Sequence, residues 1–121
     1  MGNREKPRPA HYDLEVWQDA MRLARDVYRA SAEFPSDERY GLTAQVRRSA
    51  VSIPSNIAEG AGRGSKAEYC RFLLIARGSL MELDTQLWIA KDLGLIEGDE
   101  AIREQIFRLA ARMNRLIASK R

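Results

Sequence analysis

The sequence of 121 residues holds a single cysteine, Cys70, and a single histidine, His11, and these scarcities exclude several kinds of site. A lone cysteine cannot close an internal disulfide, and one cysteine with one histidine cannot supply a zinc site of the usual ligands. A serine or cysteine nucleophile would also lack its usual base, because His11 lies in a loose segment near the start of the chain. We therefore expect no metal, no cofactor and no catalytic residue, and we do not expect an enzyme.

Long apolar runs are also missing. No run approaches the roughly 20 residues needed to span a bilayer, and the opening MGNREKPRPAHYDL lacks the apolar stretch of a secretory signal. A hydrophobic content of 45% and a charged content of 31% are ordinary for a globular protein in water. We expect a cytoplasmic protein with no membrane contact, in which a flexible arm of residues 1–12 precedes a single domain of residues 13–121.

Apolar residues recur every three or four positions in four segments, which is the spacing of helices that bury one face. The first segment follows Asp13, a candidate N-cap, and ends before Pro35. The second begins at Leu42, the third at Lys66, and the last follows a second candidate cap, Asp99. The predicted core positions are Trp17, Ala20, Met21, Ala24, Val27, Tyr28, Leu42, Val46, Ala50, Ile53, Ile57, Tyr69, Phe72, Leu73, Ala76, Leu80, Leu83, Leu87, Ala90, Leu93, Ile102, Ile106, Leu109, Met113 and Leu116. Four helices with short connections predict an all-α fold, an antiparallel up-and-down four-helix bundle.

Two of the predicted helices have unusual features. The second contains Pro54, which removes a backbone hydrogen bond and crowds the carbonyl of Ala50, so we predict a helix that is kinked or restarts there. The β-branched run AVSI would also suit a short strand, but the apolar stripe continues across the proline and no partner strand is apparent. The third helix carries Ile75, Trp88 and Ile89 outside its main stripe, so we expect it to be central or to face another subunit.

The glycine-rich stretch GAGRGSK resembles a phosphate-binding loop, but it fails both common fingerprints. Ser65 stands where a Walker loop needs its second glycine, and no strand precedes the glycines as a dinucleotide-binding motif requires. We therefore interpret the stretch as a turn, in which Gly60 is a left-handed helix cap and the following glycines reverse the chain. Ser65 and Glu68 then form a capping box at the start of the third helix.

The net charge is +3, with sixteen arginines against four lysines, and arginine offers phosphate a rigid fork of donors. The largest local excess of positive charge consists of Arg47, Arg48, Arg63, Lys66, Arg71 and Arg77. These side chains could contact a nucleic-acid backbone, or they could pair with Glu59, Glu68 and Glu82 within the bundle. No aromatic residues interleave with them as stacking platforms, so base-specific recognition is not expected.

A line of polar residues follows the second helix beside its apolar stripe, at Gln45, Ser49, Ser52, Asn56 and Glu59. Their spacing of three and four places them on one side of the helix. The line could be a recognition strip. Alternatively, Ser52 and Asn56 satisfy backbone groups freed around Pro54, or bond across a subunit interface.

The segments DLEVWQDAMRLARDVY, LTAQVRRSAVSIPSNIAEGAGR and FLLIARGSLMELDTQL together resemble the bacterial four-helix bundle proteins of ribosomal RNA intervening sequences. Residues that match the central motif of this family include Ser52, Pro54, Asn56, Glu59 and Gly60, with structural or interface roles. The resemblance implies a ring-like homopentamer without a known enzymatic activity. A related group, the accessory proteins of diversity-generating retroelements, has the same form and binds nucleic acid and a reverse transcriptase.

Two functions follow as hypotheses. The first is a non-enzymatic homo-oligomeric scaffold, a pentamer by resemblance, that binds RNA or DNA backbone through its basic surface. The second is an oligomer that binds a protein partner and has no role with nucleic acid.

Overall fold

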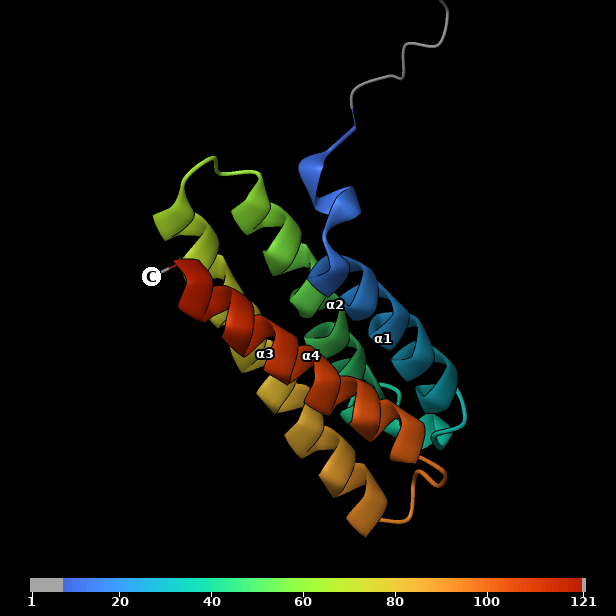
Figure 1. Cartoon of the computed structure of the whole chain (residues 1–121). Helices are drawn as coiled ribbons and strands as arrows, with labels where there is room; N and C mark the ends of the chain where they lie inside the picture. The colour runs from blue at the N-terminus through green and yellow to red at the C-terminus, as the bar shows by residue number, and fades with distance from the viewer. Residues whose placement is uncertain (1–7, 121) are drawn as a thin grey trace, which may run out of the picture.

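The computed structural model describes residues 8–120, which fold into a bundle of four long helices (Figure 1). The helices are α1 (Glu15–Ser31), α2 (Leu42–Ala61), α3 (Lys66–Asp92) and α4 (Glu100–Lys120), with short 3-10 helices η1 (Ala10–Asp13) and η2 (Ser36–Glu38). α1 packs against α2 and α4, and α3 packs against the same two helices. The described part contains no strand, so the predicted all-α bundle is confirmed. Within it, no helix is both long and apolar enough to cross a membrane.

The segment that precedes α1 is more ordered than predicted. Residues 1–7 of the expected arm lie outside the described part, but Ala10–Asp13 form η1. The rings of His11 and Tyr12 pack against Trp17, with centroid distances of 4.9 and 5.5 Å. The predicted cap at Asp13 is wrong, because α1 begins after Leu14 and the Asp13 carboxylate pairs with Arg8 at 3.0 Å.

The core lies along the axis of the bundle, and its fully buried side chains come from all four helices. It consists mainly of Val16, Ala20, Leu23, Ala24, Val27, Val46, Ala50, Ile53, Ile57, Leu73, Ala76, Leu80, Leu83, Leu87, Ala90, Ile102, Ile106, Leu109, Met113 and Ile117. Most predicted positions are confirmed, but α1 buries Leu23 in place of Tyr28, and α4 buries Ile117 in place of Leu116. Leu93 is exposed because α3 ends one residue before it. Of the other long helices α1 contacts α2 and α4, so its side that carries Trp17 is covered in part by the η1 rings and otherwise borders solvent.

α2 is one continuous helix with Pro54 inside it, so the alternatives of a restart or a strand at this point are wrong. Ile53 and Ile57 are fully buried on either side of the proline. Their burial holds both halves of the helix against the core, which offsets the backbone hydrogen bond that proline cannot make. The kink near Pro54 stays a prediction.

The glycine turn differs from the prediction in one respect. Gly60 is not a left-handed cap but a buried residue inside α2, and a Cβ atom on it would lie 2.6 Å from the Cβ of Phe72 on α3. The cap is Gly62, with a φ of −80°, and the chain reverses at Gly64, whose φ of 79° favours glycine. Gly60 is therefore required by the close approach of two helices rather than by its backbone conformation.

The start of α3 confirms half of the predicted capping box. The Ser65 hydroxyl accepts a hydrogen bond from the backbone N–H of Glu68 at 3.1 Å. The Glu68 carboxylate accepts from Arg71 Nε at 3.0 Å, one turn further along the helix, instead of returning to Ser65. The nearby arginine competes for the carboxylate because a charge-assisted hydrogen bond is stronger than one to a neutral amide.

Replacing Gly60 with alanine should destabilise the protein by about 1–3 kcal/mol, because α2 and α3 must separate to admit the methyl group. Gly78 provides a matched control inside α3, since a Cβ there meets nothing within 4 Å. Gly78→Ala should stabilise the fold by roughly 0.5–1 kcal/mol through helix propensity. Urea unfolding followed by circular dichroism measures both changes. A Gly60→Ala protein as stable as the unchanged chain would contradict the close approach.

Candidate functional site

The six basic residues that the sequence analysis grouped together do not form one surface. Arg47 and Arg48 lie in the second turn of α2, whereas Arg63 lies just beyond the other end of the same helix. Sixteen residues of helix correspond to about 24 Å along the axis. The structure therefore separates Arg47 and Arg48 from the residues near the α2–α3 turn.

Arg47 joins two helices. Its Nε donates to Ser31 Oγ at 2.8 Å, and its Nη2 donates to the backbone carbonyl of Tyr28 at 3.1 Å. The guanidinium also lies 4.6 Å from the centre of the Tyr28 ring. These contacts place a positive charge on a carbonyl in the last turn of α1, so Arg47 stabilises the contact between α1 and α2.

Arg63 and Arg71 lie at the α2–α3 turn and are paired with acidic neighbours. Arg63 bonds to Glu59 at 2.8 Å, and Arg71 bonds to Glu68 at 3.0 Å. Both guanidinium groups also pack against the ring of Phe72, at 5.0 and 4.6 Å from its centre. The hydrogen bond from Arg71, followed by the positive charges of Arg71 and Arg63, holds the pKa of the Glu68 carboxyl below its usual value.

The remaining three candidates differ in exposure. Arg77 is half-buried and donates to Asn114 Oδ1 on α4 at 3.0 Å. Arg48 and Lys66 are exposed, and neither forms an ion pair within residues 8–120. Of the six, these two are the most available to an external anion.

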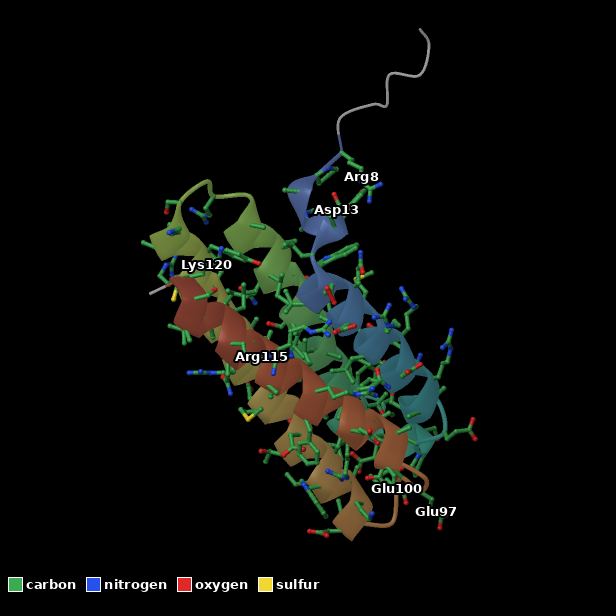
Figure 2. All side chains as sticks on the ribbon, in the orientation of Figure 1. Arg8, Asp13, Glu97, Glu100, Arg115 and Lys120 are labelled. Atoms are coloured by element: carbon green, nitrogen blue, oxygen red, sulfur yellow. The ribbon has the colours of Figure 1, made fainter. Side chains whose placement is uncertain are left out.

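The antiparallel topology adds basic residues that the sequence analysis did not consider. Lys120, in the last turn of α4, lies with its Nζ 5.6 Å from the centre of the Tyr69 ring on α3. Figure 2 shows Arg8 and Lys120 at the same end of the bundle, and Glu97 and Glu100 at the opposite end. We call the first of these the basic end; its basic residues are Arg8, Arg63, Lys66, Arg71, Arg115 and Lys120, and it also holds Asp13, Glu59 and Glu68, which pair with Arg8, Arg63 and Arg71. In an antiparallel pair of helices, the end of one lies beside the start of the other. This rule could have predicted that the last residues of α4 lie near the start of α3.

The opposite end of the bundle is acidic. It contains the connections between α1 and α2 and between α3 and α4 (Figure 1). Its acidic residues, here called the acidic end, are Asp37, Glu38, Asp92, Glu97 and Glu100. The modest net charge of +3 therefore conceals a separation of charge along the helices.

Two residues of the predicted polar line, Ser52 and Asn56, form a half-buried hydrogen-bond network with Ser79 between α2 and α3. Asn56 Nδ2 donates to the carbonyl oxygen and the hydroxyl of Ser52, at 2.8 and 2.9 Å, and the Ser52 hydroxyl lies 2.8 Å from that of Ser79. The Asn56 amide thus bonds to a backbone carbonyl close to Pro54, that of Ser52, whereas the carbonyl that the proline itself leaves without its helical donor is that of Ala50. Glu59 stands outside the network, paired with Arg63.

This network lies at the base of a polar groove of about 390 Å³ between the two helices. The groove is lined by Gln45, Arg48, Ser49, Ser52, Ser79, Glu82 and Gln86. Arg48 and Glu82 are exposed at its rim, while Ser49 and Ser79 are buried. The Ser52–Ser79 bond thus favours one register of α2 against α3, because a shift would leave the buried Ser79 hydroxyl without this partner.

A second polar cluster, which the sequence analysis missed, joins α3 to α4 near the acidic end. The buried Asp99 carboxylate accepts from Arg103 Nε and from Lys91 Nζ, the latter at 3.4 Å. Arg103 is also buried, with its Nη1 3.6 Å from Asp84 Oδ1 and its guanidinium 3.8 Å from the centre of the Trp88 ring. The sequence does contain a signal for this cluster, the spacing of four residues between Asp99 and Arg103, which allows an acidic and a basic side chain to pair along a helix.

Asp99 was predicted to cap α4. It does stand directly before the helix, and its carbonyl accepts from the backbone N–H of Arg103 at 3.0 Å, but its carboxylate serves the ion pairs. Burial alone would raise the pKa of this carboxyl. The hydrogen bond from Arg103 and the charges of Arg103 and Lys91 outweigh burial, so the pKa of Asp99 lies below its usual value.

Among residues 8–120, no group of three or more histidine, cysteine, aspartate or glutamate side chains could hold a metal ion. Cys70 is half-buried on α3 among the side chains that border the core.

These features define a class of protein, an all-α four-helix bundle with charged ends and polar contacts between its helices. Residues 12–119 match the family model described as 23S rRNA-intervening sequence protein, so the chain belongs to this family. The match covers all four helices and confirms the resemblance drawn from the sequence motifs. The relation to retroelement accessory proteins stays an expectation. A comparison with curated proteins finds no match.

Removing the Ser52 hydroxyl should cost about 1–3 kcal/mol of stability, because Ser79 and Asn56 then each lose a hydrogen-bond partner. The double variant Ser52→Ala/Ser79→Ala should lose less than the sum of the two single variants. A double-mutant cycle from chemical unfolding measures this coupling. Additive losses would show that the two hydroxyl groups do not interact.

Replacing Asp99 with asparagine should destabilise the fold by about 3–5 kcal/mol at neutral pH, because Arg103 stays buried without its anionic partner. The folded pKa of Asp99 is lowered, so its contribution is fully present above the ordinary value of 3.8 and is lost as the pH falls through the lower, folded pKa. The difference in unfolding free energy between the two proteins should therefore shrink below about pH 4. Urea unfolding from pH 7 to pH 2.5 measures it, and a constant difference would contradict the ion pair.

Proposed function

We propose that this chain is a homo-oligomeric scaffold without catalytic machinery, whose basic end binds the backbone of RNA or DNA. The observation that carries the proposal is the gathering of Lys66 and the arginines of the α2–α3 turn with Arg115 and Lys120 of α4. Cationic side chains on one surface attract phosphate groups and release the counterions bound to them. The ring of five copies implied by the family resemblance belongs to this proposal.

The chemistry of the basic end favours contact with phosphate over recognition of bases. Phe72 is buried and Tyr69 is half-buried beneath Lys120, while Tyr12, beside Arg8, is 42% exposed. One partly exposed ring does not make the series of stacking platforms that base binding along a strand uses. Repeating the basic end around an assembly would multiply weak contacts, so each copy needs only a modest affinity.

A second candidate function is an oligomer that binds a protein partner and no nucleic acid. The ion pairs of Arg63 with Glu59 and of Arg71 with Glu68 favour it, because they already neutralise two of the arginines at the basic end. A nucleic acid would have to compete with these carboxylates for the guanidinium groups.

Binding to labelled single-stranded and duplex RNA and DNA over a series of salt concentrations tests the proposal. The double variant Lys66→Glu/Lys120→Glu should weaken binding about tenfold or more at low salt, and should lower the salt slope by about two phosphate contacts. The double variant Arg39→Glu/Arg108→Glu is the matched control. It changes the net charge equally with exposed residues outside the basic end, and it should retain nearly the full affinity.

Two results would overturn the nucleic-acid role. Equal weakening by both double variants would mean that only net charge matters. Binding of the unchanged chain weaker than millimolar at about 50 mM salt would leave the basic residues as structural groups, and would support the protein-interaction candidate. Light scattering in the same buffers reports the size of the assembly independently.

A further inference from the structure

Both tryptophans of the chain lie at the surface, and they lie over opposite edges of the bundle. Trp17 lines an apolar groove of about 570 Å³ between α1 and α2. The α1 wall also carries Met21 and Tyr28, and the α2 wall carries Val51 and Ala58. We call this the α1–α2 groove. Tryptophan, tyrosine and methionine are the residues most enriched where proteins bind one another.

The second apolar surface is a ridge over the contact between α3 and α4. Two cross-helix contacts mark its ends: Arg77 bonds to Asn114 at 3.0 Å, and Trp88 stacks on Arg103 at 3.8 Å. Between them lie Met81, one turn beyond Arg77, and Phe107, one turn beyond Arg103. Met81, Trp88 and Phe107 are 45%, 47% and 63% exposed. These three side chains are the α3–α4 ridge.

The two surfaces are unlike and complementary in shape. One is hollow and the other projects, so neither can fill a copy of itself across a twofold axis. The ridge is short enough to enter the groove of a second copy. Met81 and Trp88 are about 10 Å apart along α3, whereas the α1 wall of the groove extends about 16 Å from Trp17 to Tyr28. Exposed apolar surfaces of this kind commonly mark binding sites.

The charges beside the two surfaces are also complementary. Arg25 and Arg29 line the groove, and none of its lining residues is acidic. Asp84 and Asp92 flank Trp88 on α3; Asp84 lies 3.6 Å from Arg103, and the neighbouring Lys91 is paired with Asp99 at 3.4 Å. At the groove, Arg29 is paired with Asp26 at 3.1 Å. The exposed Arg25 of the groove can therefore face the exposed Asp92 of the ridge, which favours this pairing over contact of like surfaces.

We infer that the α3–α4 ridge of one copy docks into the α1–α2 groove of the next. This inference rests on the homo-oligomer of the proposed function and names the surfaces that build it. α1 contacts α2 and α4, and α3 contacts the same two helices, so groove and ridge lie on opposite edges of the bundle. A contact between different surfaces on opposite edges is heterologous, and it closes into a ring when successive copies are rotated by a constant angle.

Two variants separate the surfaces. In the ridge variant, Met81→Lys/Phe107→Lys, two exposed apolar residues become cations that would face Arg25 and Arg29. In the groove variant, Val51→Glu/Ser55→Glu, two exposed residues of the α2 wall become anions that would face Asp84 and Asp92. The matched control is Ile75→Lys/Ile89→Lys, two α3 residues 41% and 46% exposed that lie outside the ridge. Circular dichroism and thermal unfolding verify that each variant folds.

Mixing the variants tests the heterologous contact directly. Light scattering should give an assembly larger than a dimer for the unchanged chain and the control, and a monomer for each variant alone. An equimolar mixture of the ridge and groove variants should assemble again, into a dimer or a larger particle, since each contributes one intact surface and the new lysines and glutamates attract each other. Both tryptophans should shift to shorter emission wavelengths when the unchanged chain assembles.

The contrary results are distinct. A monomeric unchanged chain would overturn the homo-oligomer of the proposed function together with this contact. Three outcomes would overturn the contact but not the oligomer. The assembly could survive both variants, it could be lost in only one of them, or only the control could disrupt it. A mixture that stays monomeric would also overturn it, because unlike surfaces must rescue each other.

Discussion

The structure depends on how closely α2 and α3 approach at Gly60 and Phe72, where even a methyl group on the glycine would collide. At this separation hydroxyl groups can bond directly across the contact, as Ser52 and Ser79 do at 2.8 Å. α1 then packs against α2, α4 packs against α3, and α1 and α4 contact each other. The close approach of α2 and α3 therefore determines where the turn between them lies. The position of this turn determines which residues reach the basic end.

The polar contacts in this bundle lie where helices meet rather than in a pocket. Arg47 joins α2 to α1, Arg103 joins α4 to α3, and the serine network joins α2 to α3. Buried polar groups are costly unless each finds a partner, so such contacts select one arrangement of helices over others that would bury similar apolar area. A scaffold needs that rigidity, because any surface it presents is only as well placed as the helices beneath it.

How far the sequence predicts this structure depends on whether the partner of a residue lies in the same helix. The apolar stripes and the Ser65 cap are local, and both could be found from spacing. Gly60 was misread because a glycine near a helix end is equally compatible with a left-handed cap and with a neighbouring helix. Arg47 and Lys120 show the same limit in the candidate site, since their places follow from contacts with other helices that spacing cannot reveal.

The opposite charges of the two ends have a consequence for the molecule as a whole. Positive charge at one end and negative charge at the other give the bundle an electric dipole moment directed along its helices. A polyanion at a distance exerts a torque on such a dipole and turns the basic end toward itself before any contact forms. If copies stand side by side in the same sense, their moments add, so the particle has two different faces and only one of them attracts a polyanion.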